Sequence, residues 1–262
     1  MKDLFSIKGK TALVTGGSRG IGEMIAGGFL ASGAKVYISS RKVDACDATA
    51  ERLMKTFGGK CISLPANVAE LDGISSLVET LSEREDKLDI LVNNARFVRP
   101  GGVVDGGNLV FAQQEMEVNC LGLMRLAQAF GPVMRGRGAD GVNSATAWVN
   151  ILSVYAYCNL PPFGTYSASS AAAHSLSQCL RSELRAGGVR VMNVYTSPID
   201  DEWHQPLPPP KVDAVKLSAA VIEGLQEGLE EVYVGDVAED LIDRWAAGPK
   251  LLELEMTRQG GA

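Results

Sequence analysis

Short runs of apolar, β-branched residues alternate along this chain with helix-length segments, and this alternation constrains the fold more than any other feature. The short runs are typical of buried strands, and the longer segments carry apolar residues at the three- and four-residue spacing of helices. The expected strands are 11–15, 35–39, 60–64, 88–92, 148–152, 189–194 and 232–234, and the expected helices are 20–32, 44–57, 70–86, 109–134, 164–187, 213–228 and 236–257. Because alternating strands and helices favour parallel pairing, the pattern predicts an α/β protein with a doubly wound parallel sheet of about seven strands and helices on both faces.

The length and composition fit a single domain of this architecture. With 262 residues, of which 46% are hydrophobic, the chain can bury a full core. No flexible linker or internal repeat divides it. We therefore expect one domain over residues 1–262.

Charge and the first residues restrict the partners and the compartment. The net charge of −6 provides no positive field that would attract nucleic acid or anionic lipid. Residues 1–8 mix charged with apolar side chains and therefore do not form a secretion signal, and no apolar stretch reaches the ~18 residues of a membrane span. We expect a soluble, cytoplasmic protein that binds neither nucleic acid nor membranes.

Cysteine and histidine usage gives no indication of a metal site. The five cysteines are widely spaced and include no CxxC pair. The two histidines, His174 and His204, are not spaced as ligands on one helix face. We predict reduced, mostly buried cysteines and no metal.

The first expected strand runs directly into a glycine-rich turn that opens a helix. The turn reads Thr15-Gly16-Gly17-Ser18-Arg19-Gly20-Ile21-Gly22. Glycine lets the backbone turn tightly and approach a pyrophosphate, and the N–H groups at a helix N-terminus attract that phosphate. A glycine triplet alone is weak evidence, but after the first strand of a repeated β-α pattern it predicts a dinucleotide-binding Rossmann fold.

The end of the second expected strand indicates which dinucleotide is bound. Versions that bind NAD carry an acidic residue there for the ribose hydroxyls, whereas residues 38–42 read Ile-Ser-Ser-Arg-Lys. Arg41 and Arg19 can present guanidinium groups to a 2′-phosphate, with Ser40 as a hydroxyl donor. The sequence therefore favours NADP(H) over NADH, although two solvated surface arginines would give the same pattern.

Further motifs lie near the expected strand ends. Asn93-Asn94-Ala95 follows the fourth strand, Asn119 lies on the next helix, Ser153 follows the fifth strand, and Tyr166 comes thirteen residues later. With the glycine turn, these motifs make nearly the whole chain resemble the short-chain dehydrogenase/reductase (SDR) family. The first sixty residues are similar to its NADPH-dependent 3-oxoacyl reductase branch.

The resemblance implies contacts with NADP(H) along one Rossmann domain. Asn67-Val68 occupies the family's Asp-Val position that contacts adenine, with asparagine in place of aspartate. The implied cofactor-binding residues are Gly16, Ser18, Arg19, Gly20, Ile21, Gly22, Ser40, Arg41, Asn67, Val68, Asn94, Ala95, Pro198 and Ile199.

The resemblance also implies the catalytic residues, one of which departs from the family. In the family a tyrosine exchanges a proton with the substrate oxygen, a serine hydrogen-bonds that oxygen, and a lysine four residues after the tyrosine lowers its pKa. Tyr166 and Ser153 match the first two, and Asn119 would hold a water chain. The lysine position is Ser170, so the cation that favours a phenolate is missing. His174 lies two helical turns from Tyr166, too far to replace it, and is expected to be a packing residue.

Two other departures cluster near the expected nicotinamide pocket. Asn93-Asn94-Ala95 is followed by Arg96 where the family has glycine, and the family's Pro-Gly after the sixth strand is replaced by Ser197-Pro198-Ile199-Asp200. These departures put the nicotinamide pocket in doubt. They also argue that Ser170 is natural and not an engineered substitution.

We predict an NADPH-dependent reductase of a small or medium carbonyl substrate, with Tyr166 as general acid, Ser153 polarising the carbonyl and Ser170 joining by hydrogen bonds. A missing cation leaves Tyr166 a phenol, which favours reduction over oxidation. One alternative is an NADP(H)-binding enzyme without redox chemistry, such as an isomerase, cyclase or lyase. Another is a catalytically silent binding subunit.

The substrate and the assembly are less constrained. Tyr155, Tyr157, Phe163 and Trp203 suggest an apolar wall for the substrate, although loop aromatics often only pack. The resemblance implies a homodimer or homotetramer joined through the helices that start near Tyr166 and Asp213.

Overall fold

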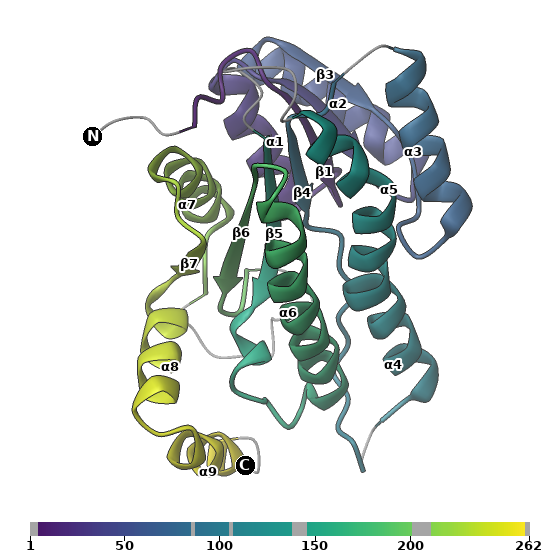
Figure 1. Ribbon diagram of the computed structural model, residues 1–262. Helices are drawn as coiled ribbons and strands as arrows, with labels where there is room; N and C mark the ends of the chain where they lie inside the picture. Colours follow the sequence, from purple (N-terminus) through teal and green to yellow (C-terminus); the bar gives the residue numbers. More distant parts are fainter. Residues whose placement is uncertain (1–4, 85–86, 105–106, 138–145, 201–210, 260–262) are drawn as a thin grey trace.

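The computed structural model describes residues 5–84, 87–104, 107–137, 146–200 and 211–259. Within them, seven strands form one parallel sheet in the order β3-β2-β1-β4-β5-β6-β7 (Figure 1). The strands are β1 (Thr11–Thr15), β2 (Lys35–Ser39), β3 (Lys60–Ser63), β4 (Ile90–Asn93), β5 (Thr146–Ser153), β6 (Val189–Thr196) and β7 (Glu231–Val234). The predicted doubly wound α/β sheet is confirmed.

Helices cover both faces of this sheet (Figure 1). They are α1 (Gly20–Ala31), α2 (Val43–Phe57), α3 (Leu71–Glu83), α4 (Leu109–Glu115), α5 (Gly122–Gly136), α6 (Gly164–Arg185), α7 (Ala214–Glu227), α8 (Asp236–Ala247) and α9 (Pro249–Gln259). One apolar core lies between the sheet and α1, α2 and α7, and a second lies between the sheet and α3, α5 and α6. Among the described residues, each helix is too short or too polar to cross a lipid bilayer.

The strand order reverses between β1 and β4. The chain proceeds from β1 to β2 and β3 on one side, and from β4 to β5, β6 and β7 on the other. The loops that leave the carboxyl ends of β1 and β4 therefore diverge to opposite faces, and ligands of open α/β sheets bind in the crevice between such loops. This topology places the glycine turn and the Asn93-Asn94-Ala95 motif at one junction.

The expected helix 236–257 is wrong, because the chain forms two helices, α8 and α9. Gly248 separates them with an extended backbone (φ −176°), and Pro249 begins α9. A proline lacks the N–H that would continue the first helix and disfavours helical geometry in the preceding residue.

The expected helix 109–134 is also interrupted. A π-helical turn over Met116–Leu121 separates α4 from α5. Such turns insert an extra residue and re-aim the side chains that they carry, frequently at functional sites. Asn119 lies within this turn.

Candidate active site

The glycine turn joins the end of β1 to the start of α1 through left-handed backbone. Gly16 has φ 63° and Gly20 has φ 55°, which lie in the left-handed region of backbone conformation that residues with a Cβ rarely adopt. A Cβ on Gly22 would lie 2.3 Å from the carbonyl oxygen of Gly16. The first turn of α1 therefore lies directly against the glycine turn, and its N–H groups begin at the carboxyl end of β1.

Thr15 and Asn94 fix this turn to the neighbouring strand. The Thr15 hydroxyl donates to the carbonyl of Val92 (3.2 Å) and accepts from the N–H groups of Asn94 (3.0 Å) and Ala95 (3.1 Å). The Asn94 amide donates to the carbonyls of Thr15 (3.0 Å) and Gly16 (3.3 Å). Asn94 and Ala95 were expected to contact a cofactor. Their backbone N–H groups and the side-chain amide of Asn94 instead bind Thr15 and Gly16 and so support the glycine turn.

The residues expected at a 2′-phosphate follow β1 and β2 side by side. The N–H of Gly17 donates to the carbonyl of Ser39 at 3.0 Å, which joins the two loops. Arg19 and Arg41 are exposed, and Ser40 is half-buried. The two guanidinium groups therefore follow adjacent strand ends, as phosphate recognition requires.

Ser18 and Asn67 are both held by hydrogen bonds to other residues. The Ser18 carbonyl accepts from the Thr49 hydroxyl of α2 at 2.9 Å. The Asn67 amide donates to Glu70 at 2.7 Å, and its oxygen accepts from the N–H of Ala69 at 3.2 Å. The Asn67 side chain thus stabilises its own loop.

Three further residues of the expected cofactor set are buried. Ile21 and Ile199 are packed in the core on the α1 side of the sheet, and Val68 is packed in the core on the side of α3 and α5. Next to Ile199, the carbonyl of Pro198 accepts from the N–H of Val212 at 3.0 Å. The side chains of Ile21, Val68 and Ile199 are occupied by packing, so a ligand would meet mainly their backbone.

The four residues expected to be catalytic meet at one small cavity at the carboxyl ends of β4 and β5. The cavity, of about 20 Å³, is lined by Asn93, Ala95, Arg96, Asn119, Ile151, Leu152, Ser153, Tyr166, Ser170 and Ala173. Ser153 is the last residue of β5, and Tyr166 and Ser170 lie one turn apart on α6. All three are buried. The structure thus brings a phenol, two hydroxyls and an amide together beside the glycine turn.

Asn119 connects the loop after β4 to the helix that carries the tyrosine. Its side-chain oxygen accepts from the N–H of Phe97 (2.8 Å), and its amide donates to the Phe97 carbonyl (2.9 Å) and to the Ser169 hydroxyl (2.9 Å). Ser169 in turn donates to the carbonyl of Tyr166 at 2.9 Å. The Asn119 side chain is thus linked through Ser169 to the backbone of Tyr166.

Glu115, which the sequence analysis missed, is a buried carboxyl residue near the site, and it binds the loop after β4. It is fully buried at the end of α4, and one carboxylate oxygen accepts from the N–H of Arg99 at 3.0 Å. The other oxygen has no hydrogen-bond partner among the described residues. Burial raises the pKa of the Glu115 carboxyl, while the nearby Thr165 hydroxyl and the amide and charge of Arg99 oppose that rise.

Apolar periodicity could not have found Glu115. Leu109, Val110 and Phe111 of the same short helix are exposed, while the glutamate points inward. The Arg99 guanidinium lies over the rings of Phe97 (4.5 Å) and Phe111 (5.9 Å). Glu115 is therefore the buried residue of α4, and its carboxylate binds the loop after β4 through Arg99.

His174 is a packing residue, as predicted. Its Nδ1 lies 2.7 Å from the Tyr195 hydroxyl, and its ring packs against Tyr157 at 4.7 Å. Burial lowers its pKa. Tyr155 and Phe163 are also buried in a packed cluster, and Trp203, the fourth aromatic of the suggested substrate wall, lies outside the described residues.

A parallel sheet with a glycine turn at its switch point and a serine-tyrosine pair at the neighbouring strand ends defines a dinucleotide-dependent enzyme scaffold. The sequence pattern of the family described as short chain dehydrogenase matches residues 10–211. The chain belongs to this family.

Individual relatives agree with this assignment. A rhamnolipids biosynthesis 3-oxoacyl-[acyl-carrier-protein] reductase of Pseudomonas aeruginosa is 38% identical over 185 residues, which cover 70% of each chain. A Burkholderia cenocepacia short chain dehydrogenase solved in complex with NADP has a TM-score of 0.82 and 30% identity, covering 96% of this chain and 98% of that one. The Pseudomonas aeruginosa RhlG/NADP active-site complex has a TM-score of 0.76 and 28% identity, covering 89% and 98%.

The contact between Gly22 and Gly16 leads to a first prediction. Gly22→Ala should lower the free energy of unfolding by about 2 kcal/mol, because the new Cβ must displace backbone. Gly136→Ala is the matched control: it lies in α5 with no atom near its Cβ position, and should leave stability unchanged or raise it by up to about 1 kcal/mol. Urea unfolding measures both, and equal stability of the two variants would contradict the close approach.

A second prediction concerns Glu115 and pH. The pKa of Glu115 is raised in the folded chain, so between the two pKa values the folded chain keeps a proton that the unfolded chain releases. The contribution of Glu115 to the free energy of unfolding therefore falls as pH rises from the pKa in the unfolded chain, about 4.3, through the pKa in the folded chain. Glu115→Gln keeps an acceptor for Arg99 without this cost. The melting temperature of Glu115→Gln relative to the native chain should therefore increase from about pH 5 to about pH 8.

The exposed Glu79→Gln on α3 is the control for the loss of a carboxylate in that series. A difference between Glu115→Gln and the native chain that does not change with pH would contradict the raised pKa of Glu115.

Proposed function

We propose that this protein is an NADPH-dependent carbonyl reductase. The observation that carries the proposal is the cavity shared by Ser153, Tyr166, Ser170 and Asn119 next to the glycine turn. The similarity to a 3-oxoacyl reductase and to two chains solved with NADP supports it. Small and medium ketones, aldehydes and 3-oxoacyl thioesters are the substrate classes to examine.

The residues around the glycine turn fit a dinucleotide. The backbone of Gly16 leaves no room for a Cβ on Gly22, so the first turn of α1 lies against the glycine turn. The N–H groups at the start of α1 would bind a pyrophosphate there. Arg19, Arg41 and Ser40 would hold the 2′-phosphate that distinguishes NADPH from NADH. When bound, the nicotinamide supplies the hydride for the carbonyl carbon.

The residues of the cavity would handle the carbonyl oxygen. The Ser153 hydroxyl accepts from the N–H of Tyr155 at 3.2 Å, so its own hydrogen can point toward a substrate oxygen. Tyr166 would donate its proton to that oxygen as it gains charge. Ser170, one turn further along α6, would hydrogen-bond within the same cavity. Reduction is the favoured direction because it begins with a protonated phenol.

Ser170 is the observation that favours a second function. A short-chain dehydrogenase that lacks the lysine could bind NADPH without transferring hydride, either as a silent subunit or as an enzyme of another class. Binding without oxidation of NADPH across the substrate panel would select this alternative.

We also propose that residues 1–262 form one domain that functions in the cytoplasm. All five cysteines are free, which suits a reducing compartment.

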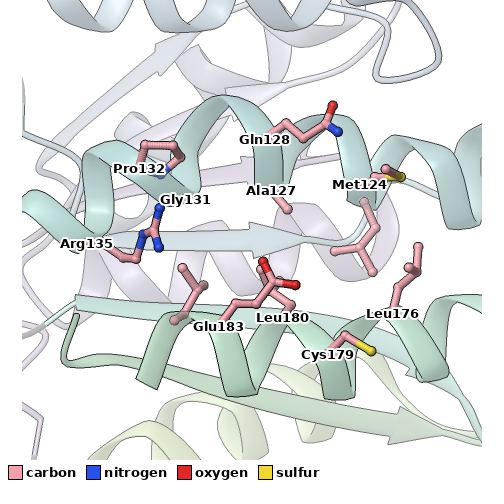
Figure 2. Close-up of a pocket in the computed structure, with 12 residues that line it drawn as sticks. Met124, Ala127, Gln128, Gly131, Pro132, Arg135, Leu176, Cys179, Leu180 and Glu183 are labelled. Carbon is pink, nitrogen blue, oxygen red and sulfur yellow. The ribbon is translucent and has the colours of Figure 1, made fainter. Parts of the chain in front are cut away.

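The outer face of α5 and α6 suggests how copies of the chain assemble. A groove of about 400 Å³ runs between these helices and is shown in Figure 2. It is lined largely by apolar residues, among them Met124, Ala127, Leu176 and Leu180. We propose that this face forms a homodimer, from which a homotetramer could be built.

Tyr166 provides the direct test of the reductase. Tyr166→Phe should lower the rate of carbonyl reduction by about 100-fold or more, because the proton donor is lost. Its affinity for NADPH, measured by cofactor fluorescence, should change little. Tyr233→Phe removes a hydroxyl that bonds Glu231 on β7 and serves as the matched control with near-native activity. Native-like reduction by Tyr166→Phe would refute the assigned role.

The dimer can be tested on the same face. Met124→Glu places a charge on an exposed residue that lines the groove and should convert the dimer to a monomer at micromolar concentration. Light scattering after size exclusion measures the mass. Leu251→Glu on α9, at a residue that is more exposed than Met124, is the control and should remain dimeric. A native chain that is already monomeric would contradict the proposal.

A further inference from the structure

Two residues that depart from the family pattern border the same cavity. Arg96 follows β4, where glycine is expected, and Ser170 lies on α6, where lysine is expected. They are far apart in the sequence, yet both line the space that Tyr166 also lines. The loss of one cation and the gain of another therefore occur at one place in the fold.

Arg96 carries the only formal charge among the described residues that line this cavity. The other lining side chains are amides, hydroxyls and apolar groups. The cavity measures about 20 Å³, so the residues that line it border one small space. A cation close to an acidic group favours the charged form of that group.

We propose that Arg96 supplies the positive charge that stabilises Tyr166 when the tyrosine has given up its proton, in place of the lysine that Ser170 replaces. The inference rests on the proposed carbonyl reduction. In that reaction a hydride forms the new C–H bond, the π electron pair moves to oxygen, and the O–H bond of Tyr166 breaks as its proton passes to that oxygen. The tyrosinate then recovers a proton from solvent.

Arg96 acts in this step through its charge alone. A guanidinium stays protonated throughout the working range of pH and has no acceptor, so it neither gives nor takes the proton. Its effect is to lower the energy of the tyrosinate, as preorganised charges do in enzyme sites.

Electrostatics also explains why the two departures occur together. A lysine at position 170 would border the same cavity as Arg96, and two like charges in a confined space disfavour one another. The neutral hydroxyl of Ser170 avoids this repulsion and can still hydrogen-bond. Arginine at 96 and serine at 170 thus form a compatible pair.

The experiment measures the ionisation of Tyr166 directly. The full chain is labelled with fluorotyrosine, and the fluorine signal of Tyr166 is identified by its absence in Tyr166→Phe. In Arg96→Gln this signal should titrate at a pH about one unit or more above that of the native chain. Arg96→Lys, which keeps a cation, should remain near the native value. The double variant Arg96→Gln with Ser170→Lys should return toward it.

Arg96→Met, which keeps the apolar stem, is a second neutral variant in case the glutamine variant does not fold, and thermal melting confirms folding of each. Coincident titration of Tyr166 in the native chain and in a folded neutral variant would overturn the inference. So would a neutral variant that only weakens the binding of anionic substrates, since Arg96 would then be a substrate contact.

Activity separates this inference from the proposed function. The pH profile of alcohol oxidation in Arg96→Gln should move upward with the fluorine signal, and kcat for reduction should fall roughly tenfold with little change in KM. A native chain that reduces no carbonyl, while its fluorine signal depends on Arg96, supports the charge role and overturns the reductase. Reduction with an unchanged pH profile in Arg96→Gln overturns the charge role and leaves the reductase intact.

Discussion

The hydroxyl of Thr15 joins the carboxyl ends of β1 and β4, and the site depends on this junction. One oxygen donates to Val92 and accepts from both Asn94 and Ala95. It thereby holds the glycine turn against the loop that leaves the neighbouring strand. Since the strand order reverses at this point, the same bonds set the width of the crevice in which a dinucleotide would lie.

A second set of contacts fixes the other wall of the site. The loop after β4 is bound twice by the chain that follows it, at Phe97 by Asn119 and at Arg99 by Glu115. Asn119 lies within the π-helical turn Met116–Leu121, and its side chain reaches both this loop and Ser169 of α6. Burial disfavours the charged form of the Glu115 carboxyl. The contact that holds the loop at Arg99 therefore lowers the stability of the fold when this carboxyl is charged.

The charges of the site are distributed differently from those that the family resemblance implies. Two exposed arginines follow β1 and β2 at the expected phosphate end, and a third, Arg96, lies at the cavity of Tyr166. The position on α6 that would carry a lysine is a neutral Ser170. The one charged residue that lines the cavity in the described part of the chain thus comes from the loop after β4, a segment held by the side chains of Asn119 and Glu115.

Local sequence determined the seven strands, most helices, the glycine turn and the identities of Ser153, Tyr166 and Ser170, because periodicity and turn glycines act over a few residues. The prediction of a single helix over 236–257 overlooked the Gly248-Pro249 break, which the local sequence does mark. Local sequence could not indicate Glu115, because the burial of this residue depends on the loop after β4. That Arg96 and Ser170 share one cavity was decided only by tertiary structure, since it requires β4, β5 and α6 to meet across many residues of intervening chain.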